Sequence, residues 1–196
     1  MLADASVRNA ATIAAAAVAA ARSQTVRLPG EDVAADLVAA LAKEVMDLDI
    51  RIKQADKAIE DRFRRHRMAD VIVSMPGFGY RLGAELLAAI GELDLITSAD
   101  HLAAYAGLAP VANDSGKRTG RLHTPSRYNR RLRRVTYLSA LTSMRCHPES
   151  RAYYERKRAE GKRPIQAIVC LARRRTNVLW ALMRDNRTWQ PEPPTD

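Results

Sequence analysis

The sequence predicts an all-α protein, in which a helical hairpin or coiled-coil arm precedes a compact helical domain that contains a helix-hairpin-helix. Three observations predict this class. Apolar residues recur at helical spacing in several segments, prolines and glycines separate those segments, and no segment is convincing as a strand. We place the arm at residues 1–69, the compact domain at 70–188 and a disordered tail at 189–196.

The arm begins with an alanine-rich helix at residues 3–22, which ends before Pro29 and Gly30. A second helix is expected over residues 31–67, about 55 Å long at about 1.5 Å per residue. Its apolar positions follow the 4-3-4-3-4 spacing of a coiled-coil seam: Leu41, Val45, Leu48, Ile52, Ala55 and Ile59. Such a stripe needs a partner, which is the first helix folded back, a second copy of the chain, or the chain's own globular domain.

A helix-hairpin-helix is predicted at residues 70–92, after the basic cluster RFRRHR of Arg62–Arg67. Two short helices are joined by residues 75–79, where Pro76 begins the turn and Gly77 and Gly79 permit positive φ and close backbone approach. This motif binds DNA phosphate through loop amides at a helix N-terminus. The alternative is an ordinary tight turn between two helices.

Further helices are expected at residues 98–106, 128–144, 148–160 and 164–184. Ser98 is the expected N-cap of the first of these helices. Residues 111–126 are predicted to be a loop because glycine, asparagine, aspartate and proline recur there.

The charge distribution predicts a surface that binds nucleic acid. The chain has 32 Lys and Arg against 22 Asp and Glu, and residues 117–145 hold nine cations and no acid. Uncompensated cations at this density favour a phosphate-bearing partner over a solvated surface or a ribosome-like tail. We assign this surface to residues 115–134, and the candidate DNA-binding residues are Gly77, Gly79, Lys117, Arg118, Arg121, Arg127, Arg130, Arg131 and Arg134.

Several other classes of site or location are disfavoured. The two cysteines and four histidines lack the spacing of metal ligands, so no metal site is expected. No segment has the run of about 20 apolar residues that a membrane span needs, and a cytoplasmic location follows as the default. The loop residue Ser115 has exposure and nearby cations, but no visible proton acceptor, so from its surroundings it is an ordinary turn residue.

The motifs SMPGFG, GAELLAAIG, LAAYAGLAP, RYNRRLRR, SRAYYERKRAEGK and QAIVCLARRRTNVLWALMRD resemble the C-terminal domain of IS110-family transposases. The resemblance runs from about residue 8 to residue 188. Members of that family are bacterial insertion-sequence recombinases with a RuvC-like DEDD nuclease domain, a coiled-coil linker and a serine-bearing C-terminal domain, and a bridge RNA guides them.

The resemblance implies that Ser115, in a loop at residues 107–126, is the catalytic serine that attacks a DNA phosphodiester and holds the strand as a phosphoserine. It implies that Lys117, Arg118 and Arg121 lie near the scissile phosphate. It also implies DNA and a guide RNA as partners and a nucleoid-associated location in a bacterium. The apolar stripe of the 31–67 helix indicates assembly with a second copy or with a full-length transposase.

The sequence departs from the family pattern in two respects. Tyr128 stands where many members have glycine, and no DEDD domain precedes the arm in this sequence, so Mg²⁺ is expected only where such a domain is supplied. We therefore expect this chain alone to bind nucleic acid without cleaving it. The alternatives are a non-catalytic DNA- or RNA-binding module or truncated remnant, and a tyrosine recombinase that uses Tyr128 or Tyr137.

Overall fold

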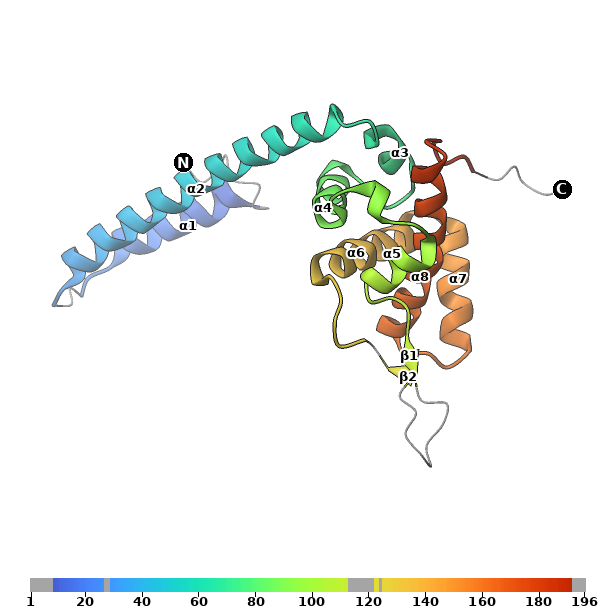
Figure 1. Ribbon diagram of the computed structural model, residues 1–196. Coiled ribbons are helices and arrows are strands. Elements are labelled where there is room, and N and C mark those ends of the chain that lie inside the picture. Colours follow the sequence, from blue (N-terminus) through green and yellow to red (C-terminus); the bar gives the residue numbers. More distant parts are fainter. Residues whose placement is uncertain (1–8, 27–28, 113–121, 124, 192–196) are drawn as a thin grey trace. The chain divides into compact units, whose positions relative to one another are not determined.

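The computed structural model describes residues 9–26, 29–112, 122–123 and 125–191 of the chain, and it confirms the all-α class (Figure 1). The described chain forms two compact units, Met1–Ile52 and Lys53–Asp196. The predicted domain boundary at residue 69 differs from this division and stays a prediction. The helices are α1 (Ala10–Ser23), α2 (Glu31–Arg64), α3 (Ala69–Ser74), α4 (Tyr80–Ile90), α5 (Ala99–Tyr105), α6 (Arg130–Cys146), α7 (Pro148–Ala159) and α8 (Pro164–Arg184), with a 3-10 turn η2 (Leu93–Leu95).

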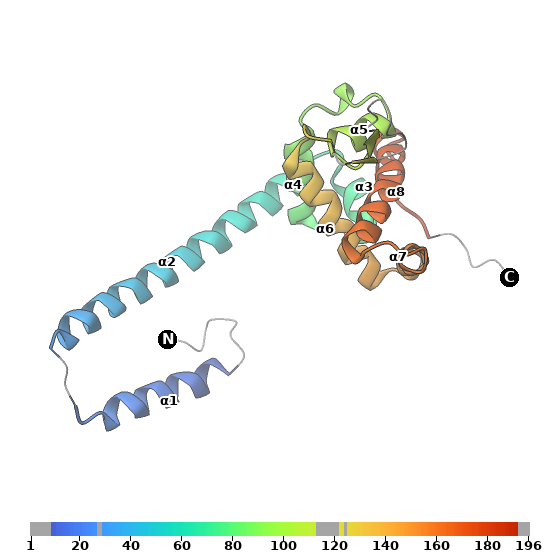
Figure 2. The ribbon, with the colours of Figure 1, turned by 90° about the horizontal axis from the view of Figure 1, so that it is seen from below.

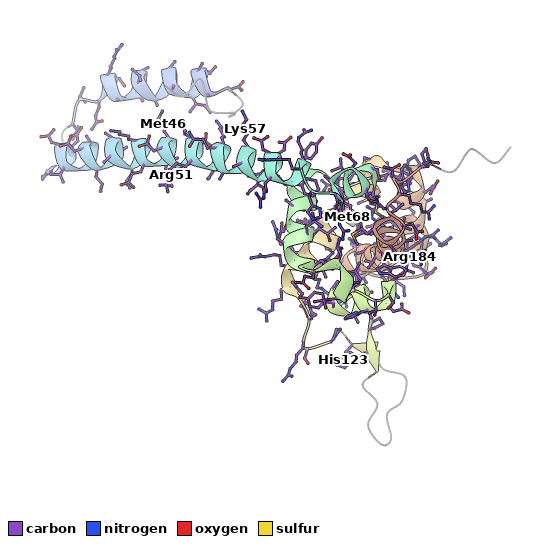
Figure 3. All side chains as sticks on the ribbon, turned by 45° about the horizontal axis from the view of Figure 1, so that its top comes forward. Met46, Arg51, Lys57, Met68, His123 and Arg184 are labelled. Carbon is purple, nitrogen blue, oxygen red and sulfur yellow. The ribbon has the colours of Figure 1, made fainter. Side chains whose placement is uncertain are left out.

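One strand pair lies within the segment that the sequence predicts to be a loop. β1 (Val111–Ala112) pairs antiparallel with β2 (Leu122–His123), with Val111 opposite His123. The His123 ring, labelled in Figure 3, adds a contact of 3.1 Å between its Nδ1 and the Val111 carbonyl oxygen. Strands of two residues are too short to produce an alternating pattern, which explains why the sequence does not predict them.

The predicted seam of α2 is exposed in the unit Met1–Ile52. Leu41, Val45, Leu48 and Ile52 are between 49% and 65% exposed. The side chains of α1 are also exposed along most of the helix, apart from the buried Ala10. Within the described residues α1 therefore does not bury the stripe, and the first-helix hairpin is not the partner that the seam pattern requires.

The core of the unit Lys53–Asp196 lies among α3 to α8. α6 packs against α4, α7 and α8, and α8 also contacts α3 and α5 (Figures 1 and 2). The helices α4, α6 and α8 each direct a stripe inward, because their buried residues recur at helical spacings such as three and four. The largest completely or almost completely buried side chains include Ile72, Met75, Leu86, Leu102, Leu132, Leu171 and Leu179.

The last turns of α2 are fixed to α4 by aromatic packing. The ring of Phe63 is buried against Gly83, where a Cβ would lie only 2.5 Å from the Phe63 Cζ. The same ring meets Tyr80 edge to face, with 6.2 Å between ring centroids. Arg64 covers the Tyr80 ring at 3.8 Å, so this end of α2 belongs to the packed domain.

α4 and α6 run antiparallel, and a glycine sets how closely they approach. Gly77, in the turn before α4, has φ +88°, and a Cβ there would overlap the Ser139 carbonyl oxygen and lie 2.8 Å from the Ser143 amide nitrogen. At the other end of the pair, Asn129 before α6 bonds to Ala89 near the end of α4. The turn can pack on α6 because residue 77 lacks a side chain.

Replacing Gly77 with alanine should destabilise the domain by about 2–5 kcal/mol, which combines a left-handed backbone cost of about 1–2 kcal/mol with overpacking of about 1–3 kcal/mol. Gly161→Ala is the matched control, because Gly161 has φ +83° and nothing within 4 Å of an added Cβ. The control should show the backbone cost alone. Urea unfolding followed by circular dichroism measures both, and equal losses would contradict the close approach of Gly77 to α6.

Candidate nucleic-acid interface

The predicted DNA-binding residues divide into two groups. Gly77, Gly79, Arg127, Arg130, Arg131 and Arg134 lie in the part of the chain that the structure describes. The predicted catalytic Ser115 and its neighbours Lys117, Arg118 and Arg121 lie outside the described residues. The described part of the predicted interface therefore consists of the start of α6 and the turn before α4.

Asn129 fixes the position at which α6 begins. Its Oδ1 accepts a hydrogen bond of 2.9 Å from the Leu132 amide, and its Nδ2 donates to the Ala89 carbonyl at 2.9 Å and to the Tyr105 hydroxyl at 3.0 Å. The Asn129 amide also donates to the Tyr105 carbonyl at 2.8 Å. One side chain thus caps α6 and joins it to the ends of α4 and α5. An asparagine directly before a helical segment is the signal that could have identified this cap from the sequence.

Arg127, Arg130 and Arg131 are exposed around the start of α6. The first turn of α6 contains no acidic residue, and among the described residues neither Arg130 nor Arg131 forms an ion pair. Cations at a helix N-terminus oppose the helix dipole at a cost of about 0.3–1 kcal/mol each. These arginines therefore do not stabilise α6 by themselves, and an anion bound beside them would compensate their charge.

The other arginines of this run already have partners within the protein. Arg134 donates through Nη1 to both carboxylate oxygens of Glu85 on α4, at 2.6 and 2.7 Å. Arg133 donates to the Gly107 carbonyl oxygen and lies 5.1 Å from the Tyr128 ring centroid. DNA binding by Arg134 stays a prediction, and Glu85 reduces the charge that this arginine offers to a phosphate.

Two tyrosines that could serve a tyrosine recombinase are packed against the protein. The Tyr128 ring lies directly on Gly107, where a Cβ would be 2.6 Å from the Tyr128 Cγ. Tyr137 is partly buried against the core. These contacts give both side chains a structural role, and the structure adds no support for a tyrosine nucleophile.

The turn before α4 is held from the inside of the domain. Met75 and Phe78 are buried, and the Gly77 backbone faces α6. Gly79 is exposed and precedes the first residue of α4. The close approach to α6 explains the glycine at 77 without a ligand, while Gly79 leaves the N-terminus of α4 open. Phosphate binding by either glycine stays a prediction.

Arg175 on α8 is a buried cation that the sequence analysis does not identify. It is 9% exposed and donates to Ser143 Oγ at 2.7 Å, to Ser139 Oγ at 2.9 Å and to the Pro76 carbonyl oxygen. Burial lowers the pKa of Arg175 to about 10, while its interaction with Cys146 acts in the opposite direction. The guanidinium therefore stays charged at neutral pH. Its position could have been inferred from spacing, because Ile168, Ala172, Arg175, Leu179 and Leu182 follow a 4-3-4-3 pattern.

Two other kinds of feature are missing from the described residues. Within the described ranges, no group of three or more His, Cys, Asp or Glu side chains is arranged to hold a metal ion. None of the described helices combines the length and the apolar character needed to cross a bilayer.

The sequence of this chain is similar to a transposase family and to proteins of insertion elements. Residues 69–155 match the model of the Transposase IS116/IS110/IS902 family. The uncharacterized 42 kDa protein of insertion element IS900 from Mycobacterium paratuberculosis is 57% identical over 189 residues, which cover 96% of this chain and 47% of that protein. The 43.6 kDa protein of insertion element IS110 from Streptomyces coelicolor is 38% identical, over 87% of this chain and 42% of that protein.

A pilin gene-inverting protein from Moraxella bovis is 32% identical over 127 residues, which cover 62% of this chain and 38% of that protein. The chain spans about half the length, or less, of these curated relatives.

Substitutions of Asn129 should separate its cap from its bonds to α4 and α5. Asn129→Ser keeps an oxygen for the Leu132 amide but is too short to reach Ala89 and Tyr105, so a loss of about 1–2 kcal/mol is expected. Asn129→Ala also removes the cap and should cost about 1 kcal/mol more. Thermal unfolding of the two variants measures the difference, and identical stabilities would mean that Asn129 does not cap α6 in solution.

Proposed function

We propose that this chain is the DNA-contacting, C-terminal part of a transposase that exchanges DNA strands through a serine nucleophile, because residues 69–155 match the model of the IS116/IS110/IS902 family of transposases. The relatives support a recombination role, because the Moraxella bovis protein is named for gene inversion and others are insertion-element proteins. The chain matches 47% of the length of the IS900 protein, so the activity of a whole enzyme is part of the proposal.

The observation that carries the proposal is the cluster of exposed arginines at the start of α6. The first turn of α6 offers no acidic partner to Arg127, Arg130 and Arg131, which are exposed. The Asn129 cap fixes the start of the helix that presents them. DNA offers one phosphate charge per about 1.7 Å of duplex axis, and arginine binds phosphate through two parallel N–H donors. Contacts of this kind position a protein on the DNA backbone without reading its sequence.

The proposed chemistry uses Ser115, on the strength of the family resemblance. The serine hydroxyl oxygen attacks the phosphorus, the bond from phosphorus to a deoxyribose oxygen breaks, and that oxygen leaves with a proton. The strand is then held as a phosphoserine until a hydroxyl of another strand reverses the step. Lys117, Arg118 and Arg121, which follow the serine closely in the sequence, would neutralise the phosphate.

The nuclease half of the active site is proposed to come from a DEDD domain in the same or another polypeptide. Its carboxylates would hold Mg²⁺, which stabilises the charge on the departing oxygen. This chain alone is therefore proposed to bind DNA, and a guide RNA, without cleaving DNA. A cytoplasmic, nucleoid-associated location follows from the same proposal.

The exposed seam of α2 supports assembly with a second copy or with a full-length transposase. Leu41, Val45, Leu48 and Ile52 share one stripe at heptad spacing, and α1 leaves them exposed. Parallel or antiparallel pairing of two such helices would remove the stripe from water. Assembly with a full-length transposase would bring the DEDD domain of that protein into the same complex.

Converting Arg127, Arg130 and Arg131 together to glutamine should weaken DNA binding. The slope of the logarithm of the binding constant against the logarithm of the salt concentration should become less steep by about 0.9 for each phosphate that the variant no longer neutralises. The charge-matched control is Lys43→Gln, Arg51→Gln and Lys57→Gln on α2, which should leave the slope unchanged. Arg134→Gln should act less than Arg130→Gln, because Glu85 already pairs with Arg134. Fluorescence anisotropy with a labelled duplex at several salt concentrations measures the slopes, and equal slopes for the arginine triple variant and the native chain would refute the interface.

The serine mechanism predicts that Ser115→Ala abolishes a covalent protein–DNA adduct in a mixture that supplies a DEDD domain, while leaving DNA affinity unchanged. Ser126→Ala is the control, because Ser126 is an exposed serine of the same basic run. Denaturing gel electrophoresis of labelled DNA detects the adduct. Undiminished adduct from Ser115→Ala would refute Ser115 as the nucleophile.

A further inference from the structure

A cavity of about 520 Å³ lies among α7, α8 and residues 187–190, apart from the arginines at the start of α6. α7 and α8 pack side by side here (Figures 1 and 2). The volume lies within the range of about 300–1,000 Å³ that is typical of small-ligand sites. Among the residues of the turn before α4, Met75 lines the cavity, whereas Gly77 and Gly79 do not.

The cavity wall carries an excess of positive charge. Arg174, Arg175 and Arg187 line it, against the carboxylate of Glu149. Arg187 is within 3.5 Å of Asp185, whereas Arg174 and Arg175 form no ion pair within the described part of the chain. Arg175 is buried among neutral partners, and its Nε is a buried side-chain nitrogen without a hydrogen-bond partner in that same part. A buried cation without a counterion favours the binding of an anion beside it.

Two aromatic rings line the same cavity. The backbone amide of Trp189 donates to Ser74 Oγ at 2.8 Å, and the Trp189 indole meets the His147 ring edge to face at 5.2 Å between centroids. The Tyr153 ring has Arg174 at 5.0 Å from its centroid. Aromatic rings beside guanidinium groups form the combination that stacks a nucleobase and holds its phosphate.

A chain of hydrogen bonds orders the polar groups of the wall. His147 Nδ1 lies 3.1 Å from Ser150 Oγ, Ser150 Oγ lies 2.6 Å from Ser143 Oγ, and Arg175 Nη1 donates to Ser143 Oγ at 2.7 Å. Ser143, Ser150 and Arg175 are all buried, so these groups have fixed positions before a ligand enters. Fixed donors lower the entropy cost of binding.

We propose that this cavity binds one unpaired nucleotide, with its phosphate against Arg174, Arg175 and Arg187 and its base against Trp189. A cavity of this volume admits a single nucleotide, whereas a duplex keeps its bases stacked inside the helix. The aromatic rings distinguish this ligand from a phosphopeptide, which needs only the cations. The site goes beyond the proposed function, because it would fill whether or not the arginines of α6 contact DNA.

Trp189 provides the reporter for the test, since Trp180 and Trp189 are the two tryptophans of the chain. In a Trp180→Phe background, Trp189 fluorescence should be quenched by a mononucleotide or by a single-stranded oligonucleotide. Quenching by the mononucleotide identifies a free nucleotide as a sufficient ligand. Quenching by the oligonucleotide alone identifies a nucleotide within a strand. Either result supports the site.

The double variant Arg174→Gln and Arg187→Gln should weaken this binding at least about tenfold, which corresponds to about 1.4 kcal/mol. Arg151→Gln with Arg158→Gln is the control, because it removes the same charge from exposed positions of α7 outside the cavity. No quenching by either ligand, equal quenching by a blunt duplex, or an equal loss in the control would overturn the proposal. The Arg127, Arg130 and Arg131 triple variant should leave mononucleotide quenching unchanged, which separates this test from that of the proposed function.

Discussion

The guanidinium of Arg175 is the contact on which the packed domain depends. It reaches from α8 to Ser139 and Ser143 on α6 and to the Pro76 carbonyl in the turn before α4. Burying a charge is costly unless hydrogen bonds replace its hydration; three neutral acceptors serve the two Nη groups here, while Nε has no hydrogen-bond partner among the described residues. Removal of this side chain would leave the Pro76 oxygen and Ser139 Oγ without this donor in the interior, whereas Ser143 Oγ would keep Ser150 Oγ as a partner. Burial of the charge therefore costs free energy of hydration, and its hydrogen bonds fix α8, α6 and the turn before α4 in one arrangement.

The packing of α4 on α6 sets the geometry of the proposed DNA surface. Serines at 139 and 143 leave room for Gly77 to touch the α6 backbone, and this approach sets the spacing of the antiparallel α4–α6 pair. At the far end of the pair, Asn129 bonds to Ala89 and caps α6. Arg130 and Arg131 are then presented on a rigid helix rather than on a loop. Arg133 bonds to the Gly107 carbonyl oxygen and Arg134 pairs with Glu85, so the arginines of the α6 start that stay available for phosphate are Arg127, Arg130 and Arg131.

The helices could be predicted from the sequence because their signals are local. Pro29 and Gly30 separate the first two helices, Pro148 and Pro164 begin α7 and α8, and Ser98 caps α5 as its position suggests. The pairing of Arg134 with Glu85 joins residues 49 positions apart, so no local pattern could reveal it. Arg175 stands within three consecutive arginines, which resemble a solvated surface unless helical spacing is followed. The role of Ser115 rests on family resemblance, because a turn serine has no local feature that marks it as a nucleophile.

The bond from Arg175 to Pro76 also has a consequence for the order in which the domain forms. Its donor and acceptor are 99 residues apart, so the turn before α4 obtains this partner only after α8 has been synthesised. Closing a long loop has an entropy cost that precedes the gain from the contact. The packing of the segment from α3 to α7 would therefore be completed only when α8 joins it, in a late, cooperative step.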